Sequence, residues 1–581
     1  MGFGMRKTGH DQAGDVSSVT EETAVDVRHV PVVVTEDDID YPHGLRLALI
    51  MGSAYISTFL VALDRLIVTT AIPRITDEFG DVKNVGWYGS AYLLTTCGLM
   101  LFFGKLYVLY SVRVIFVVAM IFLEVGSVVC GAAKNSVTLI VGRVIAGIGA
   151  GGVFSGAITV TVYALPLHRR PLFQGLYGLV FGLANVLAPL LGGAFTDNSS
   201  TTWRWSFYIN LPLGGVSMVL IAFLLKSPAR ETTLIPTKQK LRELDPPGTI
   251  TLLAGITCLL IALEWGGTKY AWSEGRIIAL LTLGLFLLVC FVVIQIAFPK
   301  TATVPPRVFS QRSIAASCFA NFSNGAVLFT VYYFLPVWFQ GIQGVSPVQS
   351  GIRLFPAVIG MVVGTIIAAA VTQITGYYTP VILAMLPLMA VGAGLLTTLQ
   401  VHTSEAKWIG YQVPFGIGMG AALQGPLLAA QTVLALRDVP LGTSLVYFAQ
   451  NLGGAVFVSV GQNLFNNKFV KELTGVPGVD AHTILGKGAT HIVDIPEPTR
   501  SIVVAAYNEA LRQVFIAGVI LSTFPFLGTL FVEWRSVKKS EPTPNVDVEN
   551  DSDRAMREAT NAGPETETED KAVSSTEKRV T

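Results

Sequence analysis

Charged side chains are what this sequence has least of. Only 14% of its 581 residues are Asp, Glu, Lys or Arg, against about 25% in a soluble globular domain. Of these 79 residues (40 basic and 39 acidic), 33 lie in 1–46 and 533–581, which leaves 46 for the 486 residues between. So few charges cannot keep the surface of a soluble domain hydrated. The composition excludes a soluble enzyme, a disordered protein and a fibre, and indicates an integral membrane protein.

Other signals are missing as well. The five cysteines form no CxxC pair and lie in apolar or small-residue runs, so neither a disulfide framework nor a zinc site is indicated. The first 44 residues hold no apolar run that could form a cleavable signal peptide. We find no phosphate loop, no ion-selectivity filter and no Arg-rich voltage helix. A net charge of +1 suggests no nucleic-acid partner, and no cofactor is expected.

Long apolar runs are what the sequence does have. A helix of about 20 apolar residues crosses a hydrocarbon core about 30 Å thick. Ten-residue alternations, the mark of a membrane barrel, do not occur. Fourteen spans are predicted, at 47–69, 87–107, 114–133, 138–160, 172–194, 205–225, 248–266, 276–298, 314–340, 352–371, 380–400, 410–432, 442–464 and 513–533.

The Lys and Arg residues between the spans predict how the chain lies in the membrane. An even number of spans places both tails on one side. The short loops on that side carry thirteen Lys and Arg residues, against six on the other. The positive-inside rule therefore predicts cytoplasmic termini and places the long segment 465–512 outside the cell. Asn198-Ser199-Ser200 is then a glycosylation sequon on an outer loop.

A few ionisable residues lie inside the predicted spans, where a charge is costly and needs a partner or a wet cavity. Taking Pro73 as the outer end of the first helix and 1.5 Å per residue, Asp64 lies about 12 Å deep, Arg143 about 9 Å and Glu124 about 13 Å. An acid near an arginine lets a proton compete with the salt bridge. A static buried pair that only fixes helix register is the alternative. The full set is Asp64, Arg65, Glu124, Arg143 and Glu264.

Four stretches carry a family resemblance. They read LDRLIVTTAIPRI at 63–75, WRWSFYINLP at 203–212, YFLPVWFQ at 333–340 and QNLGG at 450–454. Together they resemble the major facilitator superfamily, and within it the fourteen-helix drug:proton antiporters of filamentous fungi. In that family the arginine that Arg143 matches is linked with proton transfer, and Asp64 and Glu124 are similar to family acids. Leu66 departs from the family, which usually has Thr there.

The fifth predicted helix resembles the antiporter motif of that family. The matching residues are Gly178, Gly182, Pro189, Gly192 and Gly193. Ala188 replaces the Gly that normally precedes the proline. The extra methyl group should stiffen the helix bend only slightly. The resemblance therefore implies a conformational role for this helix in export.

The resemblance implies an all-α membrane protein with the major facilitator fold and no enzymatic activity. Two six-helix bundles, 46–226 and 300–535, flank a cytoplasmic linker with two inserted helices at 227–299. The tails 1–45 and 536–581 are expected to be disordered in the cytoplasm. The substrate cavity is expected between the bundles, with alternating access by rocking, and the protein is expected to be a monomer.

Uncharged polar and aromatic residues indicate the character of that cavity. An apolar, aromatic pocket with a few hydrogen-bonding groups suits a hydrophobic ligand that also forms hydrogen bonds. The candidate cavity residues are Gln340, Gln424, Gln431, Tyr333, Phe448 and Gln450.

These expectations lead to one functional hypothesis and two alternatives. The first is proton-driven export of small amphipathic molecules, such as toxins, secondary metabolites or drugs, across the plasma membrane. The partners are then the substrate, protons and the lipid bilayer. Proton-coupled uptake or vacuolar transport of siderophores or amino acids is the second. A carrier of basic amino acids should have more acids in its cavity, which weighs against that cargo. A receptor that does not transport is the third.

Overall fold

The computed structural model of the chain describes most of the span between the two tails. The described residues are 40–538 apart from 82–83, 198–201, 227–232, 234, 268, 475, 477–480, 482–483 and 486–494. The predicted glycosylation site Asn198 lies outside them, and so do nearly all residues of the two predicted tails.

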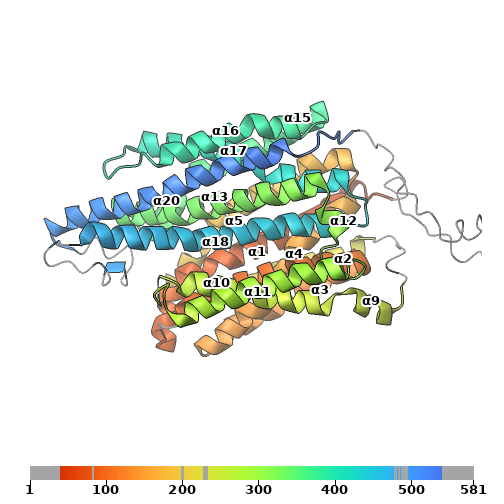
Figure 1. Cartoon of the computed structure of the whole chain (residues 1–581), viewed down its shortest axis with the longest axis horizontal. Coiled ribbons are helices and arrows are strands. Elements are labelled where there is room, and N and C mark those ends of the chain that lie inside the picture. The colour runs from red at the N-terminus through yellow and green to blue at the C-terminus, as the bar shows by residue number, and fades with distance from the viewer. Residues whose placement is uncertain are drawn as a thin grey trace, which may run out of the picture.

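Long helices lying side by side make up the molecule (Figure 1). Fourteen helical stretches of the described chain are long and apolar enough to cross a membrane, and each coincides with a predicted span. The count of fourteen is therefore confirmed. They are α1 (Gly44–Phe79), α2 (Val85–Leu109), α3 (Val112–Gly131), α4 (Ser136–Ala164), α5 (Arg170–Asp197), α6 (Trp205–Tyr208) continued by α7 (Asn210–Leu224), α10 (Pro246–Trp265), α11 (Gly275–Ala297), α13 (Arg312–Gln343), α15 (Phe355–Thr375), α16 (Thr379–Leu396), α17 (Glu405–Val433), α18 (Val439–Leu473) and α20 (Thr499–Leu530).

In the described parts of the connections, four short helices have defined bounds. Two of them, α9 and α12, lie at the same end of the molecule (Figure 1). The α1 helix begins at that end and α20 finishes there, so we name it the tail end and the opposite one the far end. The short helices are η3 (Leu167–Arg169), α9 (Thr237–Glu243), α12 (Pro306–Phe309) and α14 (Pro347–Ile352).

The spans pack into two groups. One apolar core is built from α1 to α7, and another from α13 to α20. The pair α10 and α11 packs together and touches the rest through α2 and α18. Large apolar side chains cover the outside of α11, where Phe286 is 63% exposed and Ile296 66% exposed. Such a surface is stable only against lipid or another apolar partner.

Several helix ends differ from the sequence-based prediction. The α1 helix runs through Pro73 and ends only at Gly80, whose left-handed backbone lets its N–H bond Thr76 O at 2.9 Å. Pro73 was therefore wrongly taken as the outer end. A proline removes one helical hydrogen bond without always ending the helix.

Both ends of the segment 465–512, which is predicted to be long and external, are helical in the described residues. The α18 helix continues to Leu473 and α20 already begins at Thr499. Apolar character fades in these extensions, and ion pairs along one helix face help to stabilise them. Lys468 and Glu472 are 2.7 Å apart, and Glu509 lies 3.4 Å from Arg512. The hydropathy therefore marks where an apolar span ends, and not where the helix ends.

At the tail end, polar contacts fasten the inserted helices. Asp245 caps α10 through Gly248 N at 2.9 Å and also accepts hydrogen bonds from Gln295 and Thr303. Arg307 of α12 forms a two-pronged ion pair with Asp438, which precedes α18, at 2.6 and 2.8 Å. The hydrogen bonds that Arg307 donates to Asp438 raise the pKa of Arg307 above its usual value. These contacts tie the linker region to the second group of helices.

Candidate functional site

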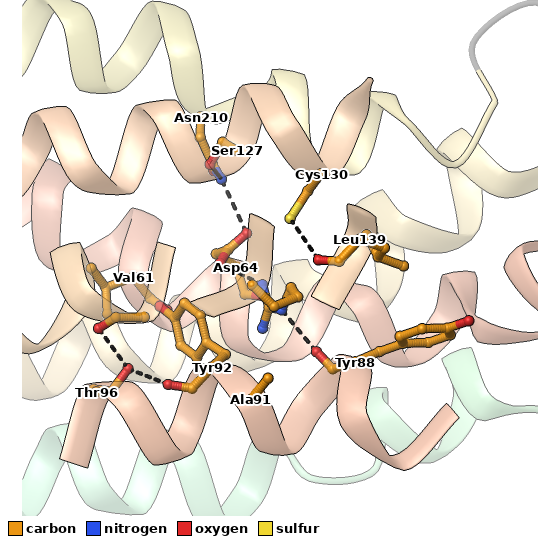
Figure 2. A network of polar contacts seen from close by, with 12 residues as sticks. Val61, Asp64, Tyr88, Ala91, Tyr92, Thr96, Ser127, Cys130, Leu139 and Asn210 are labelled. Atoms are coloured by element: carbon orange, nitrogen blue, oxygen red, sulfur yellow. Dashed lines mark hydrogen bonds and ion pairs between the residues drawn. The ribbon is translucent and has the colours of Figure 1, made fainter. Parts of the chain in front are cut away.

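A fully buried ion pair joins α1 to α4. Arg143 Nη1 lies 2.6 Å from Asp64 Oδ2, and both side chains are 0% exposed. Arg143 also donates from Nε to Tyr88 O at 2.8 Å, and its guanidinium carbon lies 4.1 Å from the centre of the Tyr92 ring. Figure 2 labels three of its partners, Asp64, Tyr88 and Tyr92. A buried ion pair is stable only when further hydrogen bonds fix its geometry.

A third helix completes the pair. Asn210, the first residue of α7, donates from Nδ2 to Asp64 Oδ1 at 3.2 Å and to Ser127 Oγ of α3 at 3.0 Å. Figure 2 shows Asn210 and Ser127 above the aspartate. Two of the stretches that carry the family resemblance, 63–75 and 203–212, therefore meet at this carboxylate.

The pair is not fully satisfied. Arg143 Nη2 and Asn210 Oδ1 are buried and have no hydrogen-bond partner. Each buried group without a partner costs about 1–3 kcal/mol. A proton on Asp64 would remove the charge that holds Arg143, so protonation and the ion pair compete directly. This arrangement can switch between a tight and a loosened state.

Glu124 lies apart from this pair. Its two carboxylate oxygens are buried and have no hydrogen-bond partner. A Cβ atom added to Gly214 of α7 would overlap the Glu124 carboxylate, so this glycine makes the space that the acid occupies. Asp64 and Arg143 come together as predicted, whereas Glu124 forms no bond with either.

The two parts of the 203–212 stretch make different contacts. Asn210, in the second part, contacts Asp64, whereas the first part makes contacts at the far end. Trp203 Nε1 donates to Glu78 Oε2 at 2.7 Å, and Arg204 Nη2 lies 2.7 Å from Glu78 Oε1. The hydrogen bond from Arg204 lowers the pKa of Glu78 below its usual value. Arg204 also donates to Ala133 O at 2.9 Å. The end of α1 is thereby held against the start of α6.

The α5 helix, which carries the predicted conformational motif, lies between α1 and α15. On one face, a Cβ added to Gly182 would lie 2.6 Å from Val358 Cγ1, and one added to Gly178 would lie 3.2 Å from Thr365 Oγ1. Both partners belong to α15, in the other helix group. The two glycines therefore allow close approach between the groups, which is the surface where sliding is required.

The remaining motif residues lie nearer the far end of α5. A Cβ added to Gly192 would lie 3.0 Å from Ile67 O of α1, and one added to Gly193 would lie 3.6 Å from Val348 of α14. Pro189 lies inside the helix, and its ring faces α14. The motif residues of α5 therefore contact both helix groups. A motif that only packed one face of the helix would need contacts with a single group.

A cavity lies between the two groups of helices. Its lining comes from α1, α4 and α5 on one side and from α13, α15, α17 and α18 on the other. We name it the central cavity and define it by Arg65, Gln174, Phe329, Gln424, Tyr447 and Gln450. Its character is mostly apolar and aromatic, with a few polar groups, as in sites for small organic ligands.

Two of the six predicted cavity residues, Gln424 and Gln450, line this cavity. The other four do not, and the prediction is corrected for them. Gln340 donates to Ser350 Oγ at 2.9 Å, and Gln431 donates to Leu427 O of its own helix at 3.1 Å. Tyr333 is 49% exposed and does not line the central cavity. Phe448 packs into a separate apolar cluster.

Sequence reasoning missed Gln174 and Phe154 as lining residues and did not assign Arg65 to the cavity. One signal for Gln174 was available. Gln174 and Gly178 are four residues apart and share a face of α5, so the motif glycine already marked the side that faces the other group. For Phe154 no comparable signal exists.

Two helix groups with a cavity between them and a buried ion pair beside it define a membrane transporter of the secondary type. The comparison with known families agrees. The family model "Major Facilitator Superfamily" matches residues 54–458, and the chain belongs to that family. It is a multi-pass membrane protein that carries small molecules and does not catalyse a reaction.

Similar proteins come from fungi. The chain is 46% identical over 516 residues to the "MFS-type efflux pump MFS1" of Arthroderma benhamiae, covering 88% of this chain and 96% of the relative. It is 46% identical over 501 residues to the "Efflux pump aflT" of Aspergillus parasiticus, covering 86% and 97%. It is 44% identical over 507 residues to the "Rubrofusarin-specific efflux pump aurT" of Gibberella zeae, covering 87% and 92%.

Among solved structures, the fold is similar to that of the human organic anion transporter MFSD10 (TETRAN). The TM-score is 0.50 with 12% identity, covering 83% of this chain and all of the other. At this identity the likeness concerns the fold alone.

Proposed function

We propose that this protein exports small amphipathic organic molecules, such as toxins, secondary metabolites or drugs, in exchange for protons. Several similar fungal proteins carry the name efflux pump, which supports export over uptake. The glycine and proline motif of α5 supports the same direction through its family resemblance. The protein would act as a monomer in the plasma membrane.

The buried pair of Asp64 and Arg143, at 2.6 Å, is the observation that carries the coupling. A proton on Asp64 removes its charge and loosens its hold on Arg143, which frees α1 to move against α4. Loss of the proton restores the pair. Each cycle then links one protonation at Asp64 to one change of access, which is what an antiporter needs.

The contacts between the two helix groups indicate what has to move. Ser155 Oγ of α4 and Ser444 Oγ of α18 are 2.6 Å apart. A Cβ added to Gly104 of α2 would lie 2.7 Å from Ser444 Cβ. Together with α5 against α15, these small-residue contacts let the groups rock about the central cavity.

The decisive experiment is export from proteoliposomes with and without an imposed pH gradient. The unmodified protein is expected to accumulate substrate against its concentration gradient only when the pH gradient is present. Asp64→Asn should lose that uphill transport while still binding substrate. A matched control is Glu509→Gln, which removes an acid from an ion pair at the helix surface. Gradient-driven export by Asp64→Asn, equal to that of the control, would overturn the mechanism.

Membrane orientation is tested separately. Single cysteines replacing Lys238 in α9 and Thr474 after α18, both exposed positions, should label oppositely with an impermeant thiol reagent in intact cells. The Thr474 position is expected to react from outside and the Lys238 position only after permeabilisation. Equal labelling of the two positions in intact cells would contradict cytoplasmic termini.

A further inference from the structure

One charged side chain lines the central cavity, and it is Arg65. It follows Asp64 directly on α1. Neighbouring residues on a helix point about 100° apart, since 3.6 residues make one turn. Asp64 therefore faces α4 and the buried pair, while Arg65 faces the space between the two helix groups. One turn of α1 therefore presents Asp64 to the buried ion pair and Arg65 to the central cavity.

Arg65 has no anionic partner. Its guanidinium carbon lies 4.0 Å from the centre of the Phe329 ring of α13. No Asp or Glu of the described chain forms an ion pair with it. A cation over an aromatic face gains about 0.5–2 kcal/mol, but its charge remains, because an arginine stays protonated in proteins. A positive charge at an apolar cavity wall attracts an anion and repels a cation.

Two amides that line the same cavity also lack partners. Gln174 of α5 is 5% exposed, and neither its amide nitrogen nor its amide oxygen has a hydrogen-bond partner. Gln424 Nε2 of α17 is likewise buried without one. Buried polar groups are nearly always hydrogen-bonded in proteins. Groups left open on a cavity wall are therefore positions where a ligand can bind.

The rest of the wall favours a flat, apolar body. The Phe154 ring lies 6.4 Å from that of Phe181 and 6.2 Å from that of Tyr447, with interplanar angles of 47° and 42°. These three rings come from α4, α5 and α18. Aromatic side chains spaced in this way pack favourably against another aromatic ring.

We propose that the central cavity selects aromatic organic anions, in which a carboxylate or an ionised phenol binds Arg65. The ring system of such a ligand packs against Phe154 and Tyr447. Its other polar groups bind the open amides of Gln174 and Gln424. This inference rests on the proposed export function and names the substrate class for it.

Three probes of equal shape and different charge test the proposal. They are 2-naphthoate, 2-naphthamide and 2-naphthamidine, which are anionic, neutral and cationic at pH 7.5. Binding of radiolabelled 2-naphthoate to the purified full chain is measured directly, and the other two compete against it. We expect 2-naphthoate to bind at least tenfold more tightly than the amide, a difference of about 1.4 kcal/mol. The amidine should compete least.

Variants then assign the preference to one side chain. Arg65→Gln keeps hydrogen-bonding ability without the charge, and should reduce the preference for 2-naphthoate over the amide to less than about twofold, below 0.5 kcal/mol. Arg65→Lys keeps the charge and should retain part of the preference. Arg276→Gln is the matched control, because Arg276 is exposed and pairs weakly with Glu274 at 3.5 Å. That control should bind like the unmodified protein.

The outcomes separate this inference from the export proposal. Absence of saturable 2-naphthoate binding, equal binding of acid and amide, or a preference that survives in Arg65→Gln would each overturn it. If the unmodified protein exported the amide as fast as the acid under a pH gradient, anion selection would fail and proton-driven export would stand. Arg65-dependent binding of 2-naphthoate without any gradient-driven transport would support anion selection and contradict the export proposal.

Discussion

The two helix groups differ in the buried polar contact that joins two of their helices. In the first, the polar contact between α1 and α4 is an ion pair of Asp64 and Arg143. In the second, α13 and α18 meet through a neutral amide, because Asn321 Nδ2 donates to Val446 O at 3.0 Å and to Gln450 Oε1 at 3.3 Å. Both contacts are buried.

This difference separates two tasks. An amide side chain does not change its charge with pH, whereas a carboxylate does. Of these two buried contacts, the ion pair in the first group is therefore the one that a proton can open. Asn321 leads to Gln450, which lines the central cavity, so the second group connects its amides to the ligand site. The comparison gives the proton-responsive contact to the first group, here the proton half, while the second group, here the ligand half, adds neutral groups to a cavity that both groups line.

The largest effect is expected from a change at Asp64, in the proton half. Asp64→Asn should abolish uphill export, a loss of more than tenfold, since Asn cannot titrate. It also leaves Arg143 buried without its counter-charge, and breaking such a pair costs about 3–5 kcal/mol of stability. The double variant Asp64→Asn, Arg143→Gln should recover thermal stability without recovering pH-driven transport. Recovery of both would show that the pair only holds the fold.

The next effect concerns the helix that both halves touch. Pro189→Ala restores a backbone donor in α5 and should straighten it. We expect export several-fold slower at unchanged substrate binding, because the change of access is slowed. Expression and thermal unfolding are measured together with efflux, which distinguishes a slower change of access from a loss of folded protein. Normal efflux at equal expression would show that the α5 motif contributes only to helix packing.

Close contact between the halves is tested at Gly182. A methyl group there would meet Val358 Cγ1 at 2.6 Å, and overpacking of this kind costs about 1–3 kcal/mol. Gly182→Ala should slow export about two- to fivefold, which is the range that a part of this cost produces. Val358→Ala in the same chain should restore the rate. A double variant as slow as the single one would locate the defect elsewhere.

A smaller effect is expected in the ligand half. Asn321→Ala removes three hydrogen bonds, to Val446, Gln450 and Asn324. It frees Gln450, so substrate affinity should change within about tenfold, or about 1.4 kcal/mol. The dependence of transport on the pH gradient should remain. Loss of pH response in Asn321→Ala, measured in the proteoliposome assay, would break the division of tasks.

The smallest effect is expected at the far end. The pKa of Glu78 is lowered by the hydrogen bond from Arg204, so this contact stabilises the fold above the usual carboxyl pKa and is lost as pH falls through the lowered value. An exposed pair contributes about 0.2–1 kcal/mol. Glu78→Gln should lower the unfolding temperature slightly at pH 7, and the difference should shrink below about pH 4. A constant difference down to pH 3 would contradict this reason.

Much of the fold could be predicted from the sequence, because a span is a local property of about 20 residues. All fourteen spans were found in this way. Helix ends were missed at Pro73, Leu473 and Thr499, where the helix continues beyond its apolar part. Depth along each helix placed Asp64, Glu124 and Arg143 in one layer, and the family resemblance, which makes their helices neighbours, was needed to pair Asp64 with Arg143. The central cavity was mostly missed, because it depends on the face that each helix presents, and apolar side chains surround these helices on all sides.

Arg65, the cation that lines the central cavity, also affects how much net charge crosses the membrane in each proposed transport cycle. Export of a monovalent anion in exchange for one proton moves two positive charges inward. Each charge that crosses a potential of 100 mV yields about 2.3 kcal/mol, so a membrane that is negative inside would supply about 4.6 kcal/mol per cycle before the pH difference is counted. With Arg65 as ligand for an anion, the membrane voltage becomes a driving force of export. A carrier of neutral molecules would draw half as much from the same voltage.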